Sequence, residues 1–182
     1  MKFLLVLTIF ALNTTAIADE YCSDGDLNKM IGQTIYIGQG KGLSDRLVTN
    51  SGSEIFLGRY EPVTVLSASE EAPHRSIQWS ESYYISVKRS NGETGWYPCR
   101  LDIIAFNNPI PLNWSNKVIT LIHNRKAMIG MTKEQATMAW GKPKRVSSNI
   151  SAGEVSEQWI YGIGNYLYFI GNKLTNIQTS RE

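Results

Sequence analysis

The sequence predicts a β-rich protein of two domains: a small β-barrel, then an α+β domain in which two helices pack on a three-stranded antiparallel sheet. Short apolar runs separated by turn residues fill the first half of the chain, as in small all-β domains. The Asn-Asn-Pro-Ile-Pro segment at 107–111 favours an extended connector, because a residue before proline avoids the helical region. Two patterns of helical spacing and then apolar strands follow it, which is an α+β order.

A secretory signal peptide is predicted at residues 1–18. Lys2 precedes a short apolar run, and Ala16-Ile17-Ala18 forms a small-x-small cleavage site. Cleavage after Ala18 makes Asp19 the first residue of the mature chain. The apolar run is shorter than the roughly 20 residues that a membrane-spanning helix needs, and a buried N-terminal helix is the alternative interpretation. We therefore expect a periplasmic or secreted protein.

The chain has two cysteines, Cys22 and Cys99. An oxidising compartment favours a disulfide between them. Such a bond would stabilise the fold by roughly 4 kcal/mol, because it lowers the conformational entropy of the unfolded chain. Two free, buried thiols are the alternative. Glu20 and Tyr21 stand where a lipoprotein needs small residues, so we expect no lipid anchor.

Charge and hydropathy exclude several classes of partner. The 182 residues carry 18 Lys and Arg against 16 Asp and Glu, a formal net charge of +2. A nearly neutral chain has no electrostatic basis for binding nucleic acid or anionic membranes. No second apolar segment is long enough to span a bilayer. We divide the mature chain into a first domain at 19–105, a linker at 106–113 and a second domain at 114–182.

The first domain contains several segments of strand character. They are 33–37, 62–66, 83–89 and 94–98. Asn91-Gly92 stands between the last two and is a hairpin dipeptide. The glycines of segment 38–42 lack the Lys-Ser/Thr ending and the following helix of a phosphate-binding loop, so we expect a flexible loop there.

The segment 60–66, the hairpin that follows 84–87 and the closing Gly95-Trp96-Tyr97 together resemble a bacterial SH3-type domain over about residues 32–105. The resemblance implies a small barrel that binds cell-wall peptide or a Pro-rich segment. Exposed aromatics with polar tips suit such recognition. The candidate groove of such a domain consists of Tyr60, Trp79, Tyr83 and Tyr97. Trp96, in the middle of a strand, is expected in the core.

The second domain begins with two helices. Val118, Leu121, Ile122 and Arg125 have helical spacing. The next helix starts at a capping box, Thr132-Lys133-Glu134-Gln135, and ends where Gly141 and Pro143 stop it. Segment 145–150 leads into a turn, and the strand-like segments 155–161, 166–170 and 174–178 follow. Trp159 is expected in the core.

Four blocks of the second domain resemble the SmpA/OmlA-type domain, which shares its fold with small β-lactamase inhibitor proteins. They are 129–132, 140–143, 157–161 and 166–169, within about residues 114–179. The resemblance implies a periplasmic or outer-membrane-associated module that works through protein contacts. The family includes a lipoprotein subunit of the outer-membrane β-barrel assembly machine, but this chain has no lipobox and carries an extra domain. The candidate binding tyrosines of these strands are Tyr161, Tyr166 and Tyr168.

Few residues offer catalytic or metal chemistry. The only histidines are His74 and His123, and no cysteine pair has zinc-ligand spacing. We therefore expect no metal site and no cofactor, with both histidines at the surface or at a helix end. The paired carboxylates Glu70-Glu71 and Glu154/Glu157 are expected to be solvated.

Three functional hypotheses follow. The leading one is a non-enzymatic periplasmic binding or scaffolding protein that recognises cell-wall peptide or an envelope protein. The second is an inhibitor of a periplasmic enzyme, by analogy of fold alone. The third is a cell-wall hydrolase that uses Glu70, Glu71 or His74, and it requires these side chains to converge in a cleft.

Overall fold

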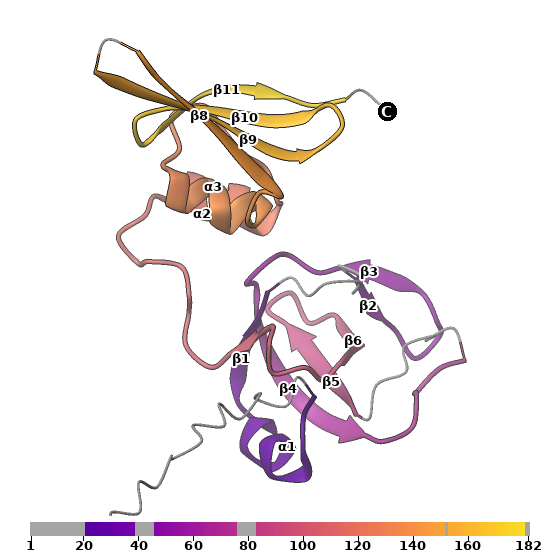
Figure 1. Cartoon of the computed structure of the whole chain (residues 1–182). Helices are drawn as coiled ribbons and strands as arrows, with labels where there is room; N and C mark the ends of the chain where they lie inside the picture. Colours follow the sequence, from indigo (N-terminus) through magenta and orange to yellow (C-terminus); the bar gives the residue numbers. More distant parts are fainter. Residues whose placement is uncertain (1–20, 39–45, 76–82, 152, 181–182) are drawn as a thin grey trace, which may run out of the picture.

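The computed structural model describes residues 21–38, 46–75, 83–151 and 153–180. In this part of the chain there are two antiparallel sheets and three helices (Figure 1). The expected signal peptide at 1–18, most of the expected loop at 38–42 and the candidate residue Trp79 lie outside the described residues. None of the described helices is long and apolar enough to cross a membrane.

The first sheet has seven strands in the order β3-β2-β6-β5-β4-β1-β7. Their bounds are β1 Thr34–Ile37, β2 Arg46–Val48, β3 Glu54–Phe56, β4 Pro62–Ser69, β5 Tyr84–Arg89, β6 Thr94–Pro98 and β7 Ile104–Ala105. The edge strands β3 and β7 are only three and two residues long, and each pairs with one neighbour. The sheet therefore stays open, and the closed barrel predicted from the sequence is not formed. We call this sheet with α1 (Asp24–Met30) the N-terminal unit.

Strand alternation builds the core of the N-terminal unit. Val63 and Val65 of β4 and Ile85 and Val87 of β5 are all buried in one core, and Val65 lies directly opposite Val87. Gly95 allows β6 to approach β2, because a Cβ there would lie 2.7 Å from the Cβ of Leu47. The glycine of the Gly-Trp pair therefore has a packing role.

The predicted disulfide is confirmed. Cys22 and Cys99 are bonded, both are buried, and their Cα atoms are 5.6 Å apart. Cys22 precedes α1 and Cys99 directly follows β6. The bond therefore fastens the start of the described chain to the centre of the first sheet, with Met30 of α1 beside Cys99.

The C-terminal unit has two helices on one face of a four-stranded sheet (Figure 1). The helices are α2 Asn116–His123 and α3 Lys133–Trp140; the strands are β8 Arg145–Ser151, β9 Glu154–Gly162, β10 Asn165–Ile170 and β11 Lys173–Gln178, in the order β11-β10-β9-β8. The sequence predicted three strands. The fourth, β8, pairs with β9 along its whole length. All its residues are exposed, so it has no buried face that a regular apolar pattern in the sequence could have indicated.

The two ends of α3 follow the sequence prediction. Gln135 N donates to Thr132 Oγ1 (3.2 Å), and Thr132 N donates to Gln135 Oε1 (3.0 Å), so the capping box is formed. Gly141 takes a φ of +84° and its amide donates to the carbonyl of Thr137. That backbone conformation favours glycine and ends the helix.

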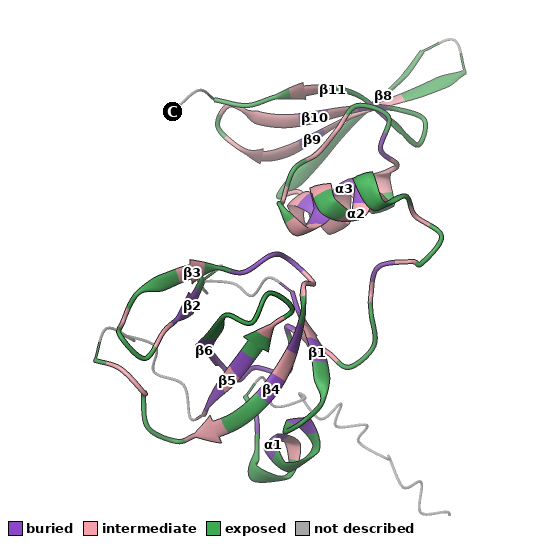
Figure 2. Cartoon of the chain, turned by 180° about the vertical axis from the view of Figure 1, so that it is seen from behind, coloured by how far each residue is buried: buried purple, intermediate pink, exposed green. Residues whose placement is uncertain are grey.

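Helices α2 and α3 lie between the two sheets (Figures 1 and 2). The hydrogen bonds of this contact come from a loop of the N-terminal unit: Arg59 N donates to the carbonyl of His123 (3.1 Å), and His123 Nδ1–H donates to the carbonyl of Arg59 (2.8 Å). Arg59 Nη1 donates to the carbonyl of Met138 on α3 (3.1 Å), and Tyr60 packs against the C-terminal core. We call this contact the junction.

Candidate functional site

The face of the C-terminal sheet opposite the helices is the first candidate site, and we call it the open face. Trp159, Leu167 and Phe169 are buried under α2 and α3. Because successive side chains of a strand point to opposite faces, Gln158 and Tyr168 point away from the helices. Tyr166, two residues before Tyr168, shares this face, and the two rings lie 6.4 Å apart.

Three polar side chains are linked across this face. Gln158 Nε2 donates to the Tyr168 hydroxyl (3.1 Å), and that hydroxyl donates to Gln178 Oε1 (3.0 Å). The chain of hydrogen bonds joins β9, β10 and β11. Each group fixes the rotamer of its neighbour, so the phenol presents a defined polar edge rather than a mobile one.

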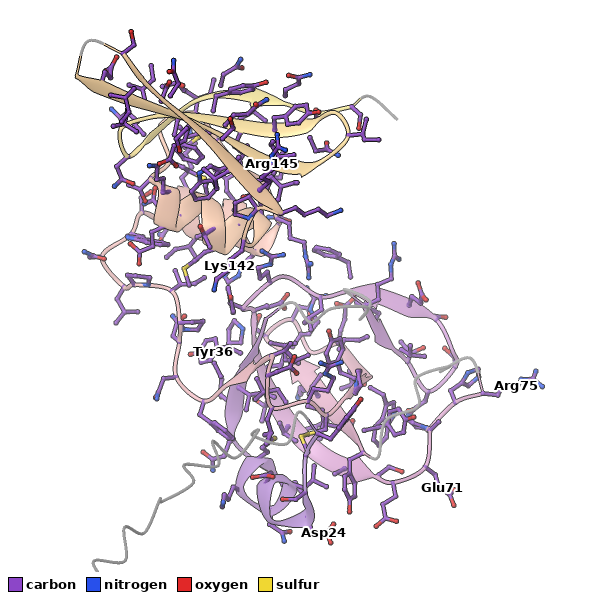
Figure 3. All side chains as sticks on the ribbon, in the orientation of Figure 1. Asp24, Tyr36, Glu71, Arg75, Lys142 and Arg145 are labelled. Atoms are coloured by element: carbon purple, nitrogen blue, oxygen red, sulfur yellow. A yellow bond between two sulfur atoms is a disulfide. The ribbon has the colours of Figure 1, made fainter. Side chains whose placement is uncertain are left out.

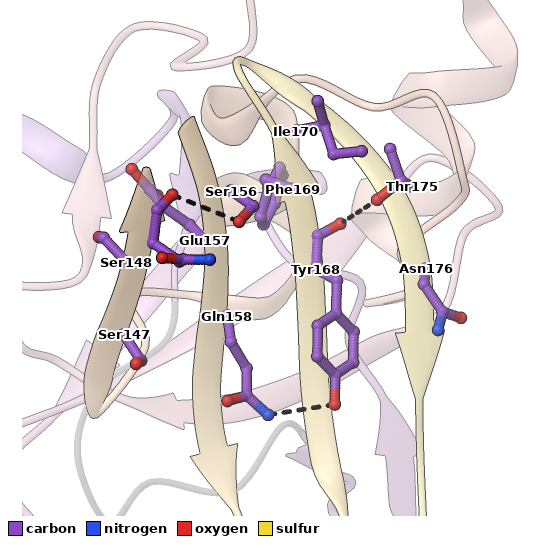
Figure 4. Close-up of a pocket in the computed structure, with 11 residues that line it drawn as sticks. Ser147, Ser148, Ser156, Glu157, Gln158, Tyr168, Phe169, Ile170, Thr175 and Asn176 are labelled. Carbon is purple, nitrogen blue, oxygen red and sulfur yellow. Dashed lines mark hydrogen bonds between the residues drawn. The ribbon is translucent and has the colours of Figure 1, made fainter. Parts of the chain in front are cut away.

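A shallow hollow of about 420 Å³ adjoins this network (Figure 4). Its lining includes hydroxyls and amides from all four strands, and one carboxylate, that of Glu157, which pairs with Lys133. The hydroxyl and amide residues include Ser147, Asn149, Ser156, Gln158, Tyr168 and Asn176. Ser156 Oγ donates to the carbonyl of Asn149, which ties β9 to β8 at the rim. The hydroxyls and amides both donate and accept hydrogen bonds, so the hollow suits the polar groups of a polypeptide.

Strand β8 is the edge next to the hollow. Every residue from Arg145 to Ser151 is exposed (Figure 2), and within the described residues no strand pairs with its outer side. An edge of this kind presents unpaired main-chain groups to a further strand. Ile150, 73% exposed, and Val155 opposite it add an apolar patch near the hairpin end.

The predicted groove of the first domain is not gathered in one place. Tyr83 donates its hydroxyl to Asp24 Oδ1 (2.6 Å), which raises the pKa of Tyr83 to about 12. Tyr97 is buried in the core of the first sheet, and Tyr60 lies at the junction. Trp96, predicted in the core, is half-buried and donates its indole N–H to Asn50 Oδ1 (2.7 Å).

Of the three predicted tyrosines of the second domain, the structure brings two together. Tyr166 and Tyr168 share the open face. Tyr161 lies on the helix side, where its ring meets Trp140 edge-on at 5.2 Å and its hydroxyl donates to the carbonyl of Gly141 (3.0 Å). Burial raises the pKa of Tyr161 above its ordinary value. Trp159 is buried, as predicted.

The carboxylates predicted to be solvated divide into two groups. Glu70 and Glu71 are exposed at the end of β4, where they line a hollow of about 410 Å³ together with Asp24 and Tyr83. Figure 3 shows Asp24 and Glu71 at the same end of the N-terminal unit. His74 is not in that hollow, because its ring lies against Gly52.

The second carboxylate pair is split between the two faces of β9. Glu154 is exposed, whereas Glu157 is half-buried, forms an ion pair with Lys133 (2.7 Å) and accepts from the Trp159 indole (2.8 Å). The Lys133 contact and then the indole bond lower the pKa of Glu157. Within the described residues no cluster of three His, Cys, Asp or Glu side chains could hold a metal ion.

No protein-family model, curated protein or solved structure matches this chain.

Sequence reasoning missed the glutamines and β8. Gln158 and Gln178 stand two strands apart and meet only through Tyr168, so no local pattern marks them. One signal was present: Gln158 directly precedes Trp159, which was expected in the core, and successive side chains of a strand point to opposite faces.

Proposed function

We propose that this protein is a non-enzymatic binding or scaffolding protein of the bacterial cell envelope, periplasmic or secreted after removal of its signal peptide. Its partner is an envelope protein that contributes an extended segment to the β8 edge. The observation that carries the proposal is the position of β8, an entirely exposed edge strand beside a polar hollow.

Strand addition explains why both features occur together. Main-chain hydrogen bonds to an edge supply affinity without regard to sequence, and pockets for alternate side chains supply specificity. Here β8 offers the edge, while Ser147, Asn149 and the Tyr168 network offer groups for side chains that cross onto the open face. The exposed Ile150 gives a partner strand one apolar contact.

We assign the two units to families on sequence resemblance: the N-terminal unit to the SH3-type domains, and the C-terminal unit to the SmpA/OmlA-type domains. The first would bind cell-wall peptide and the second would dock the protein partner. The β5–β6 hairpin and the close packing of Gly95 support the first assignment. Two helices covering one face of an antiparallel sheet support the second.

The test places a photo-crosslinking residue at Asn149 and, as a control, at Thr94, an exposed position of β6. Each variant is incubated with an envelope extract and irradiated. We expect a discrete adduct from Asn149 and none from Thr94. A double substitution, Ser147→Lys with Asn149→Lys, should abolish retention of that protein, since lysines on an edge oppose strand pairing.

The matched control for the double substitution is Ser90→Lys with Thr94→Lys, which adds the same charge to the first sheet. Adducts that are identical at both crosslinking positions, or retention that survives the β8 lysines, would overturn the proposal. Pull-down with isolated peptidoglycan tests the cell-wall assignment of the N-terminal unit separately.

A second candidate function is a cell-wall hydrolase, favoured by the hollow that Asp24, Glu70 and Glu71 share. Two carboxyl groups in one cleft are the minimum for glycoside hydrolysis. Glu70→Gln and Glu71→Gln should then remove release of muropeptides from purified wall. Wall that stays intact with the unmodified protein excludes this function, and the same assay with added wall hydrolases or β-lactamases tests the inhibitor alternative.

A further inference from the structure

The junction contains a pocket of about 330 Å³, on the side of the C-terminal sheet away from the open face. It is lined by Arg59, Arg125, Ala139, Trp140, Tyr161 and Asn165, with Thr179 at its edge. We propose that this pocket is a binding site for a carboxylate carried on an apolar group, such as the last residue of a peptide. The site is independent of the β8 edge.

The charge of the lining selects an anion. Two of the seven lining residues are arginines, and the described lining includes no Asp or Glu. Arg59 is only 3% exposed, and its Nη1 is held by the carbonyl of Met138. A guanidinium fork fixed in a poorly solvated place binds a planar carboxylate by two parallel hydrogen bonds and loses little side-chain entropy.

The positive charge of Arg59 acts on Tyr161, another residue that lines the pocket. Burial raises the pKa of Tyr161, and the positive charge of Arg59 opposes that rise. Charges interact more strongly here than in water because Tyr161 is largely screened from solvent. An incoming carboxylate would meet the same field.

The backbone is unusual on both sides of the pocket. Among the described residues only Tyr60 and Arg125 combine a side chain with a positive φ, +56° in each case. Such a conformation costs on the order of 1 kcal/mol and persists where its surroundings hold it. Tyr60 N donates to the carbonyl of Ile37, and Arg125 N donates to the carbonyl of Ile122. These hydrogen bonds hold the backbone at the two positions, and so help to place the side chains of Arg59 and Arg125 at the pocket.

The apolar and aromatic residues that line the pocket would contact the apolar group attached to the carboxylate. Trp140 and Tyr161 meet edge-on, and Ala139 leaves room beside them. Arg125 also lies over the ring of Phe56, with its Cζ 5.8 Å from the centroid, which orients the guanidinium. The volume is at the small end of ligand pockets, roughly 300 Å³, so one terminal residue fits better than a long segment.

The test titrates the protein with four probes and follows tryptophan fluorescence and calorimetric heat. The probes are N-acetyl-alanyl-phenylalanine as the free acid, the same dipeptide as its amide, N-acetyl-glutamate amide, and inorganic phosphate. We expect the free acid to bind with a Kd of about 1 mM or lower, and its amide about tenfold more weakly. The glutamate probe separates a terminal from a side-chain carboxylate, and we expect it to bind more weakly than the free acid because it brings no apolar group.

The diagnostic variant is Arg125→Gln, since Arg125 is half-exposed and tolerates change better than buried Arg59. It should weaken binding of the free acid by about tenfold. Arg125→Lys keeps the charge without the fork and should give an intermediate loss. The matched control is Arg145→Gln, which removes the same charge from an exposed residue outside the pocket and should leave Kd unchanged.

Titrations are run on the unmodified chain and on a Glu182→Gln variant, which removes the acidic side chain nearest to Thr179 along the sequence. Binding by either form that Arg125→Gln weakens supports the proposal. Equal affinity for acid and amide, equal effects of Arg125→Gln and Arg145→Gln, phosphate binding as tight as the free acid, or no binding by either form would each overturn it. Circular dichroism checks that every variant is folded.

Discussion

At the scale of single residues, hydrogen bonds between near neighbours position the helices of the C-terminal unit. Thr132 and Gln135 satisfy two amides that the first turn of α3 leaves without intrahelical partners. Glu157 reaches from β9 to Lys133 in the same turn, so the helix start is also tied to the sheet. Substitutions at these positions therefore report on packing as well as on helix stability.

Thr132→Ala removes the capping oxygen of α3. We expect it to lower the free energy of unfolding by about 1 kcal/mol, the usual value of such a cap. Thr120→Ala, at an exposed position inside α2, should change it by less than about 0.5 kcal/mol. Urea unfolding followed by circular dichroism measures both, and equal effects would contradict the role given to the cap.

Glu157→Gln should change how the free energy of unfolding depends on pH. The pKa of Glu157 is lowered in the folded protein, so its carboxylate stabilises the fold above the ordinary glutamate pKa, and this is lost as pH falls through the folded value. We expect the variant to lose about 1 kcal/mol of stability at neutral pH, and to lose little once the pH is below the pKa that Glu157 has in the folded protein. Glu154→Gln, which removes an exposed carboxylate from the same strand, is the control. Urea unfolding of the parent and both variants at a series of pH values measures these differences in the free energy of unfolding.

At the scale of elements, much of the fold could be predicted because the determining contacts are local. The capping box, the Gly141 stop and the β5–β6 hairpin all lie within short windows, and they occur where the sequence predicts them. The closed barrel and the three-stranded sheet were wrong for related reasons. The very short β3 and β7 and the fully exposed β8 carry no apolar alternation that reveals how they pair.

The disulfide is a covalent cross-link within the N-terminal unit. Replacing Cys22 and Cys99 with serine should lower the free energy of unfolding by roughly 4 kcal/mol, because it frees a long loop in the unfolded chain. Thiol titration of the unfolded, unreduced protein should find no free thiol. A serine variant as stable as the parent in urea would show that the bond constrains little.

At the scale of the whole molecule, the junction depends on contacts that no local pattern encodes. Arg59 and His123 are 64 residues apart and exchange two hydrogen bonds. The candidate sites are non-local in the same way. Tyr60, Tyr83 and Tyr97 were grouped by residue type, yet each lies in a separate environment, whereas Gln158 and Gln178 meet only after the sheet has formed.

His123→Ala tests whether the junction holds the two units together. It removes one of the two hydrogen bonds with Arg59 but none of the core contacts of α2, which come from Val118 and Ile122. We expect faster proteolysis within 106–113 and little change in the unfolding midpoint of either unit. Asn124→Ala, on the exposed neighbour, is the control. Identical cleavage rates in all three proteins would show that the junction does not limit access to the linker.

The position of the disulfide also decides how the protein would respond to pulling. Cys22 and Cys99 are 77 residues apart, so a force applied through the two ends of the chain cannot extend the segment between them. That segment represents about 260 Å of contour length, taking about 3.4 Å per extended residue. Under such a force the oxidised protein would lengthen mainly through the linker and the C-terminal unit, and reduction of the disulfide would release the remaining length.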